Sequence, residues 1–357
     1  MTPTPEFQLR FLSKLQRIFN EGDFVATYKF ALVMAIADLC IDRGSDSDEP
    51  LTLTFLDLAE KFVTYYWQQS QIFLGADGRG EVLKQSHGGQ ASIVNLILGF
   101  RERNPRETIN TSPTNAEFSR MLKAVARTIR DQPVRYFQNV AGGKDSFIFE
   151  QEKNGIRLQA GAAFCLRRFH PLVTQMARAQ WVDHIRKITS NSHVLGPSDD
   201  LDSFLFSASR QSLGVLRNGL MDLQSRCFYC DRSIIRGGDV DHFVPFSVYP
   251  RDIVPNFVLA HASCNRSKSN NLAAGNHLEH WLEFTAEYRG DLLAISQEAG
   301  MRHDEKGSLS IALWAYKNAL ASAGVAWQKS KSFTPISDRD VTLLESRIFL
   351  LNPPIPA

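Results

Sequence analysis

The chain has 357 residues, of which 43% are hydrophobic and 22% charged. This length exceeds that of a usual single domain, and the composition is that of a globular protein, which excludes extended disorder. No apolar run reaches the roughly 18 residues of a membrane span, and the first residues lack the pattern of a signal peptide. We therefore expect a cytoplasmic protein with no membrane partner.

The charge is unevenly distributed along the chain. The 40 basic and 38 acidic residues give a net charge of +2, but residues 101–190 carry 16 Lys and Arg against 8 Asp and Glu. A basic segment of this kind is typical of a protein that binds a polyanion, and equally of an amphipathic helix with a solvated face. The sequence leaves both interpretations open.

The first 135 residues have the pattern of helices joined by polar loops. Apolar side chains recur at helical spacing, and the second helix is apolar on most sides, as expected of a buried element. Thr54, with Asp57 three residues later, offers a capping start for the third helix. Helices are predicted over residues 7–19, 26–41, 54–66, 90–103 and 115–130.

A change of period marks the middle of the chain. Residues 147–151 and 156–159 alternate and are joined through Asn154-Gly155, which predicts a β-hairpin with a tight turn near residues 147–159. After it we expect helices over residues 164–188, 201–224, 278–288 and 308–323, a break over residues 196–200, and an extended tail from Phe349 to Ala357.

Three of the five cysteines fall in one short stretch, and no secretion signal suggests disulfides. Cys227-x2-Cys230 and His261-x2-Cys264 each have the spacing that lets one turn present two ligands to a tetrahedral Zn²⁺. The sequence therefore predicts a closed, structural zinc site. The alternative for His261 is a loop or catalytic histidine. The other two cysteines, Cys40 and Cys165, are expected in the core.

Four elements in order extend this stretch into a larger pattern: Cys227-Phe-Tyr-Cys230, Val240-Asp-His-Phe-Val-Pro245, Asn256-Phe-Val-Leu-Ala-His261 and Cys264-Asn-Arg-Ser-Lys268. Together they resemble the HNH endonuclease family over about residues 215–275, with a spacing similar to that of the HNH domains in CRISPR effector nucleases. The resemblance implies a zinc-supported ββα-metal nuclease fold. The fold class we expect is mainly α with a small α+β insertion.

Residues 234–244 look like a hairpin with Gly237-Gly238 at its turn. Asp241 and His242 would then be neighbours on its second strand, and their side chains would leave on opposite faces unless the strand bulges or twists. Because the family uses both residues at one site, the resemblance implies an irregular strand end that aims both inward.

Phosphodiester hydrolysis needs an activated water, a cation that offsets charge, and donors that hold the backbone. The resemblance implies that His242 is the general base and that Asp241 binds one catalytic Mg²⁺ or Mn²⁺, roles that suit an imidazole and a hard oxygen donor. The further residues it assigns are Asn265 as second metal ligand, Asn256 as a brace for the loop, and Arg266 and Lys268 as phosphate contacts.

We expect three parts: a mainly helical domain over residues 1–195 that targets or binds partners, an HNH domain over 196–275, and a helical region over 276–357 packed on the nuclease. The resemblance implies metal-dependent hydrolysis of DNA in prokaryotic defence or DNA processing, including as a subunit of a guided complex. Alternatives are a zinc-stabilised nucleic-acid-binding module, an RNA nuclease, or an effector activated by a ligand, a protein or a guide-RNA complex. One HNH motif in the chain is compatible with nicking or with a dimer.

Overall fold

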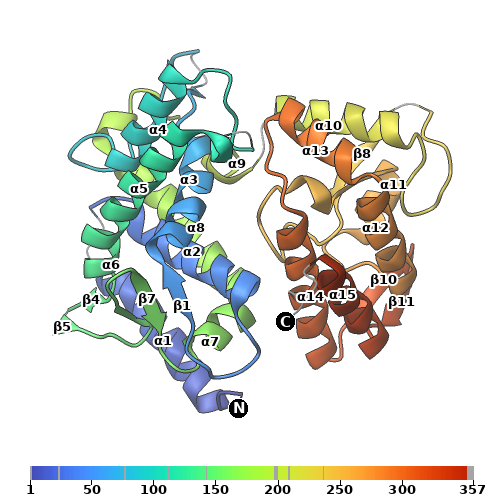
Figure 1. The fold of residues 1–357 in the computed structure, drawn as a ribbon, viewed down its shortest axis with the longest axis horizontal. Helices are drawn as coiled ribbons and strands as arrows, with labels where there is room; N and C mark the ends of the chain where they lie inside the picture. The colour runs from blue at the N-terminus through green and yellow to red at the C-terminus, as the bar shows by residue number, and fades with distance from the viewer. Residues whose placement is uncertain are drawn as a thin grey trace. The chain divides into compact units, whose positions relative to one another are not determined.

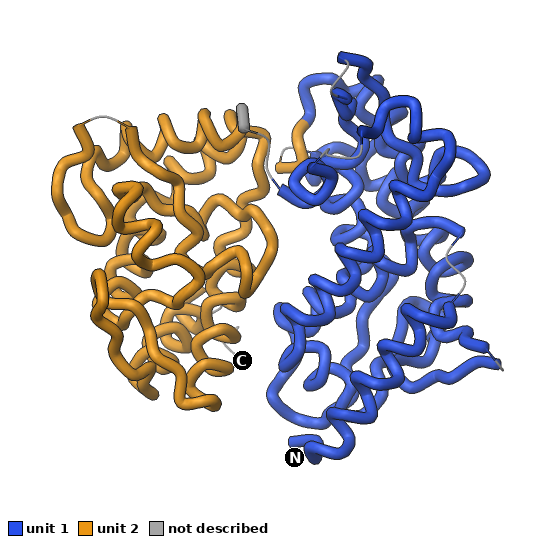
Figure 2. The backbone as a smooth tube through the Cα atoms, turned by 180° about the vertical axis from the view of Figure 1, so that it is seen from behind, with its two compact units in different colours: residues 1–107, 111–207 blue, residues 108–110, 208–357 orange. Residues whose placement is uncertain are grey.

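The fold comes from a computed structural model that describes residues 2–22, 25–75, 78–110, 112–141, 143–196, 200–207, 210–235 and 237–351 (Figure 1). The chain divides into two compact units, residues 1–107 with 111–207 and residues 108–110 with 208–357 (Figure 2). Both units are mainly helical, with small sheets. None of the helices in these ranges has both the length and the apolar content that a membrane span requires.

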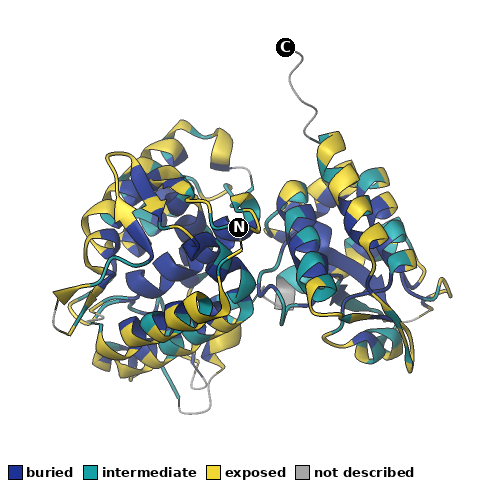
Figure 3. Cartoon of the chain, turned by 90° about the horizontal axis from the view of Figure 1, so that it is seen from below, coloured by how far each residue is buried: buried dark blue, intermediate teal, exposed yellow. Residues whose placement is uncertain are grey.

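A buried helix forms the centre of the first unit. Every residue from Tyr28 to Ile41 in α2 is buried, as the apolar run in the sequence predicts. Helices α3, α7 and α8 pack around it, and exposed residues gather on outer helix faces (Figure 3). The helices of this unit are α1 (Pro5–Glu21), α2 (Tyr28–Arg43), α3 (Phe55–Gln69), α4 (Ser92–Arg103), α5 (Ala116–Asp131), α6 (Pro133–Tyr136), α7 (Ala162–Arg168), α8 (His170–Lys187) and α9 (Leu201–Phe206).

A three-stranded antiparallel sheet in the order β1-β7-β6 completes this unit. The predicted hairpin is confirmed, because β6 (Phe149–Gln151) pairs with β7 (Gly155–Leu158), whereas β1 (Thr52–Thr54) was not predicted as a strand. Only glycine fits at position 155, since a Cβ there would lie 2.0 Å from the carbonyl oxygen of Leu53. Two-residue strands form two further pairs: β2 (Phe73–Leu74) with β3 (Gly80–Glu81), and β4 (Asn139–Val140) with β5 (Gly143–Lys144).

Local signals explain most helix ends. Thr54 and Asp57 form the predicted capping box at the start of α3. The single helix predicted over residues 164–188 is wrong, because the chain breaks at Phe169 into α7 and α8. The break precedes Pro171, which has no N–H to continue the helix.

The predicted helix over 201–224 is likewise two helices, α9 and α10 (Arg210–Leu223). Residues 197–199 of the predicted break lie outside the described residues, as do residues 208 and 209. The first unit includes α9, whose Leu201 and Leu205 are buried where it packs against α3 and α8. In this part of the chain the division between the two compact units falls after residue 207, and the three parts with bounds at residues 195 and 275 stay a prediction.

The second unit contains the segment that resembles HNH nucleases. Strand β8 (Asp239–His242) pairs with β9 (Phe257–Ala260). The predicted hairpin, in which residues 234–235 would pair with this strand, is therefore wrong. Burial explains the choice, because all of β9 is buried whereas Ile235 is 92% exposed. The remaining elements are α11 (Ala262–Lys268), α12 (Gly275–Glu287), α13 (Arg289–Ala299), α14 (Glu305–Ala321), β10 (Val325–Lys329), β11 (Ser332–Pro335) and α15 (Asp338–Leu351).

The extended tail predicted from residue 349 is wrong for its first three residues, which continue α15, and residues 352–357 lie outside the described part of the chain. The hairpin β10–β11 had not been predicted. Short 3-10 helices lie at Ser112–Thr114, Thr189–Asn191 and Val254–Asn256.

One helix of the C-terminal region covers the HNH segment. Trp281 of α12 stacks on Phe243 at 4.7 Å between ring centroids, and its indole N–H donates to the carbonyl oxygen of Pro255. Phe228, between the two cysteines of the first pair, stacks on His280 at 4.4 Å. The HNH segment and α12 thus share one core, which a segment of this size could not build by itself.

Candidate functional site

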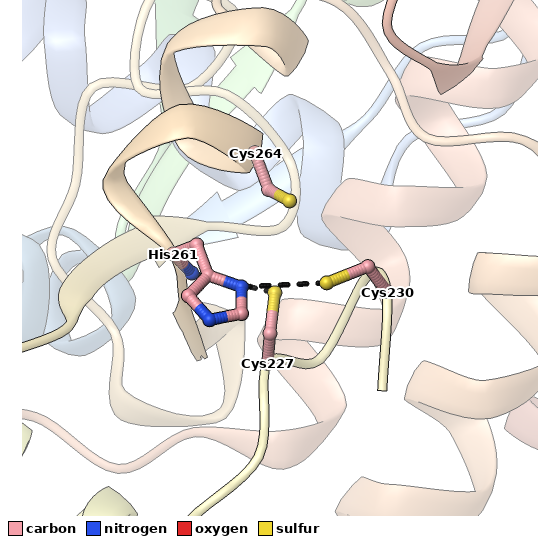
Figure 4. Close-up of side chains that lie close together, drawn as sticks. All are labelled: Cys227, Cys230, His261 and Cys264. Atoms are coloured by element: carbon pink, nitrogen blue, oxygen red, sulfur yellow. Dashed lines mark hydrogen bonds between the residues drawn. The ribbon is translucent and has the colours of Figure 1, made fainter. Parts of the chain in front are cut away.

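Four side chains with soft or borderline metal donors meet beside β9. One ligand atom from each of Cys227, Cys230, His261 and Cys264 lies within 4.8 Å of the others, and their side chains point toward one another (Figure 4). Cys264 comes from the first turn of α11 and His261 from the residue before it. Three thiols and one imidazole at this separation fit a closed tetrahedral Zn²⁺ site, the chemistry predicted from the spacing.

The imidazole of His261 is held in the orientation that metal binding needs. Its Nε2 lies 3.3 Å from the carbonyl oxygen of Ser233, to which it donates, so Nδ1 keeps its lone pair and lies 3.3 Å from Cys230 Sγ. Such an outer partner fixes the tautomer of a ligating histidine. Burial and the neighbouring Cys227 raise the pKa of the Cys264 thiol to about 12, so a cation at this position is needed to hold the side chain as a thiolate near neutral pH.

On β8, Asp241 and His242 leave on opposite faces. The ladder to β9 is regular through His242, without the irregular strand end that was expected. Asp241 is buried, and its Oδ2 accepts from the Tyr229 hydroxyl at 2.6 Å. The Lys268 ammonium lies 3.1 Å from the same oxygen, so the carboxylate charge is offset inside the protein.

His242 has a carboxylate partner that the sequence interpretation missed. Its Nε2 lies 2.6 Å from Asp252 Oδ1, and its ring packs on Phe257 at 4.3 Å and on Phe246 at 5.2 Å. If Nε2 carries the proton and donates to Asp252, Nδ1 remains as an acceptor. In the sequence, the only sign of this partner was that Asp252 is an acidic residue in the loop between His242 and Asn256.

The two asparagines have different surroundings. Asn256 is buried, accepts from the Val244 N–H at 2.8 Å and donates to the Val244 carbonyl at 2.9 Å, so it ties the chain after β8 to the start of β9. Asn265, on α11, donates to Asp239 Oδ2 at 3.2 Å. The structure thus brings Asp239 beside Asn265, a neighbour that the sequence interpretation did not name.

The two basic residues assigned to phosphate also differ. Arg266 is exposed on α11, where it can reach a bound polyanion. Lys268 is 0% exposed, and its ammonium donates to the His242 carbonyl at 2.8 Å and pairs with Asp241. Burial lowers the pKa of Lys268, and Asp241 opposes this effect. In this conformation Lys268 therefore faces the strand and has no contact with solvent.

Comparison with known families separates the two units. Residues 8–201 match the family described as domain of unknown function (DUF8808), which is more than half of the chain. The chain belongs to the DUF8808 family. Residues 227–274, a small segment, match the HNH endonuclease family, which includes all four zinc-ligand residues and the β8–β9 pair. No curated protein and no solved structure matches the chain.

Apart from residues 108–110, the DUF8808 match falls within the first unit, and the HNH match falls within the second. The HNH match supports a nuclease family, a nucleic-acid substrate and a divalent metal. The Cys227, Cys230, His261 and Cys264 cluster lies inside that match and could hold zinc. These statements agree with the resemblance found from the motif.

Proposed function

We propose that the protein is a metal-dependent HNH endonuclease that hydrolyses DNA, and that it acts in prokaryotic defence or DNA processing. The observation that carries the proposal is the His242–Asp252 pair at 2.6 Å, on the strand that adjoins the zinc-ligand cluster within the HNH match. An imidazole with a carboxylate at one nitrogen and an open second nitrogen suits a general base. The biological setting rests on the HNH family alone.

His242 activates water in this proposal. Asp252 holds the ring through Nε2, and Asn256 fixes the loop that begins after β8. The Nδ1 atom then accepts the proton of a water that attacks phosphorus. Asp252 acts through His242, so we assign it as a positioning residue.

We assign the donors for a catalytic cation to β8 and α11. Asp241 and Asn265 are the ligands implied by the motif, and Asp239 adds a second carboxylate, hydrogen-bonded to Asn265. Carboxylate and amide oxygens are ligands of Mg²⁺ and Mn²⁺, so the chemistry of these donors fits such an ion, which would displace the Lys268 ammonium from Asp241. When bound, the ion would offset charge on the phosphate and on the departing 3′-oxygen. Arg266 supplies a phosphate contact at the exposed face of α11.

One observation favours a second candidate, a nuclease that rests in an inactive state until a partner or ligand binds. The Lys268 ammonium already occupies the Asp241 carboxylate, and a cation ligated by Asp241 must compete with that ion pair. In the resting-state candidate the isolated protein cleaves weakly. Activation then separates Lys268 from Asp241 and exposes the carboxylate.

The experiment compares supercoiled plasmid, linear duplex, single-stranded DNA and RNA as substrates for the purified protein. Mg²⁺ or Mn²⁺ is added in parallel reactions, with His242→Ala beside the wild type. The proposal expects metal-dependent cleavage of DNA that His242→Ala abolishes. Cleavage of RNA alone would replace DNA as the substrate, and cleavage that His242→Ala does not affect would overturn the proposed active site. No cleavage by a folded, zinc-loaded protein would favour the resting-state candidate.

A further inference from the structure

The outer face of α5 in the first unit carries three cations in line. The buried face holds Phe118, Met121, Val125, Ala126 and Ile129, and the helix packs with α3 and α4. On the opposite side Arg120, Lys123 and Arg127 are exposed. Their spacing of three and four residues places them on one stripe, one helical turn of about 5.4 Å apart. We call these three residues the α5 ridge.

The acidic residues near the α5 ridge are already paired. Glu117 accepts from Arg103 and from Asn104, and Asp131 pairs with Arg130 at 2.7 Å. Arg120 contributes to the lowered pKa of Glu117, after the hydrogen bonds from Asn104 and Arg103. Within the described residues, none of the three ridge cations makes an ion pair of its own. The outer face of α5 therefore presents net positive charge to solvent.

The α5 ridge also borders two hollows that contain polar donors. A cavity of about 420 Å³ lies between α4 and α5, lined by Ser92, Asn95, Leu96, Ala124, Arg127 and Thr128. A second cavity of about 900 Å³ shares Ser92, Arg127 and Thr128 with the first. Arg127 therefore lies where the two hollows meet. The Asn95 amide and the Arg127 guanidinium, which both line the smaller hollow, are groups that proteins use to hold phosphate oxygens.

We propose that the α5 ridge binds the sugar-phosphate backbone of duplex DNA and supplies affinity to the nuclease without reading sequence. The proposal rests on the proposed function for its choice of DNA. A line of exposed cations one helical turn apart matches a strand of phosphates, and contacts to phosphate position a protein on DNA without carrying sequence information. This assigns the basic segment of the DUF8808 region to polyanion binding rather than to a merely solvated helix face.

The experiment measures DNA binding apart from cleavage. All variants are made in the full-length His242→Ala protein without added Mg²⁺ or Mn²⁺, and affinity for a short fluorescent duplex is followed by anisotropy from about 50 to 200 mM salt. The ridge variant combines Arg120→Ala, Lys123→Ala and Arg127→Ala. The matched control combines Arg10→Ala, Lys153→Ala and Arg157→Ala, three exposed cations of the same unit with the same total change in charge.

The ridge variant is expected to bind more weakly and to lower the slope of log affinity against log salt by about 2 to 3, since each phosphate contact contributes about 0.9. The control is expected to change the slope by less than about 1. Equal losses in the two variants would reduce the effect to bulk charge and overturn the proposal, as would an unchanged slope in the ridge variant. With an RNA duplex of the same length as a second probe, a loss of affinity for RNA and not for DNA would overturn the choice of DNA.

The two proposals fail separately. If the ridge variant loses affinity and salt dependence as expected but the wild type cleaves nothing, the ridge stands, and an active nuclease gives way to the resting-state candidate. If the wild type cleaves DNA while the ridge variant keeps its affinity, the reverse holds. Because the ridge side chains are exposed, unchanged thermal unfolding of each variant verifies that the fold is intact.

Discussion

The HNH segment and the first unit are held together by different means. In the first unit, α2 is surrounded by protein and every residue from Tyr28 to Ile41 is buried, so many interchangeable apolar contacts share the stabilisation. In the HNH segment, four ligand side chains from two short turns can share one ion. Removing one ligand should therefore destabilise the whole HNH segment at once, whereas removing one apolar side chain from the first unit should lower its stability only in part.

The largest effect is expected from removing a zinc ligand. Cys264→Ser should abolish zinc binding and unfold the segment from Cys227 to Cys264, because structural zinc contributes on the order of 10 kcal/mol to folding. Metal analysis and hydrogen exchange by peptide should detect the loss there, with α2 still protected. Cys40→Ala in the first unit is the control and should retain full zinc. A Cys264→Ser protein that also retains stoichiometric zinc would contradict the four-ligand site.

The next effect concerns the base and its partner. His242→Ala should lower kcat by about 100- to 10,000-fold, the usual contribution of a general base. Asp252→Asn should lower kcat by less, with KM unchanged, because the carboxylate holds the imidazole and does not touch the substrate. Asp252→Glu should restore part of the rate. A change in KM alone would assign Asp252 to substrate binding.

A smaller effect is expected from the buried ion pair beneath the site. Lys268→Met should destabilise the second unit by about 3 to 5 kcal/mol, since it leaves Asp241 buried without its counter-charge. The double variant Lys268→Met with Asp241→Asn should recover much of this loss. Urea unfolding at fixed zinc concentration measures both. A Lys268→Met protein as stable as the wild type would mean that Asp241 gains solvent or another partner when the ammonium is removed.

Short-range chemistry explains what the sequence could predict. The Thr54–Asp57 capping box and the Asn154-Gly155 turn depend on residues only a few positions apart, and both occur as predicted. The ligand pairs around Cys227 and His261 are likewise two local patterns, and their order along the chain sufficed to bring them together.

Errors arose where distant packing decided the outcome. The choice of β9 as partner for β8 depends on the burial of β9, and α10 packs on both strands, which residues 234–244 do not encode. The Asp252 carboxylate reaches His242 across a loop of ten positions, and no periodicity marks it. The helix break at Phe169 is a different case. Pro171 indicated it locally, but the apolar residues at helical spacing over 164–188 favoured one continuous helix.

The smallest predicted effect concerns the pH dependence of stability in the first unit, which contains the buried His184. The pKa of His184 is lowered from 6.5 to about 4, mainly by burial. The neighbouring His87 and Lys187 also lower it, and Asp183 opposes them. Between pH 6.5 and about 4, His184 is protonated in the unfolded chain and neutral in the folded chain. The free energy of unfolding therefore decreases as the pH falls through this range, by at most about 1.4 kcal/mol per pH unit. His184 also packs on Phe30 at 5.9 Å, and its Nε2 has no hydrogen-bond partner among the described residues.

His184→Phe should keep the aromatic contact and flatten the loss of stability between pH 7 and pH 5. Thermal unfolding of this variant and the wild type across this range measures the difference. If the acid sensitivity of His184→Phe equals that of the wild type, the carboxylates, and not this histidine, set the acid response of the first unit. In that case the stability of the first unit would not depend on His184 in the way that we expect the HNH segment to depend on each of its four metal-ligand side chains.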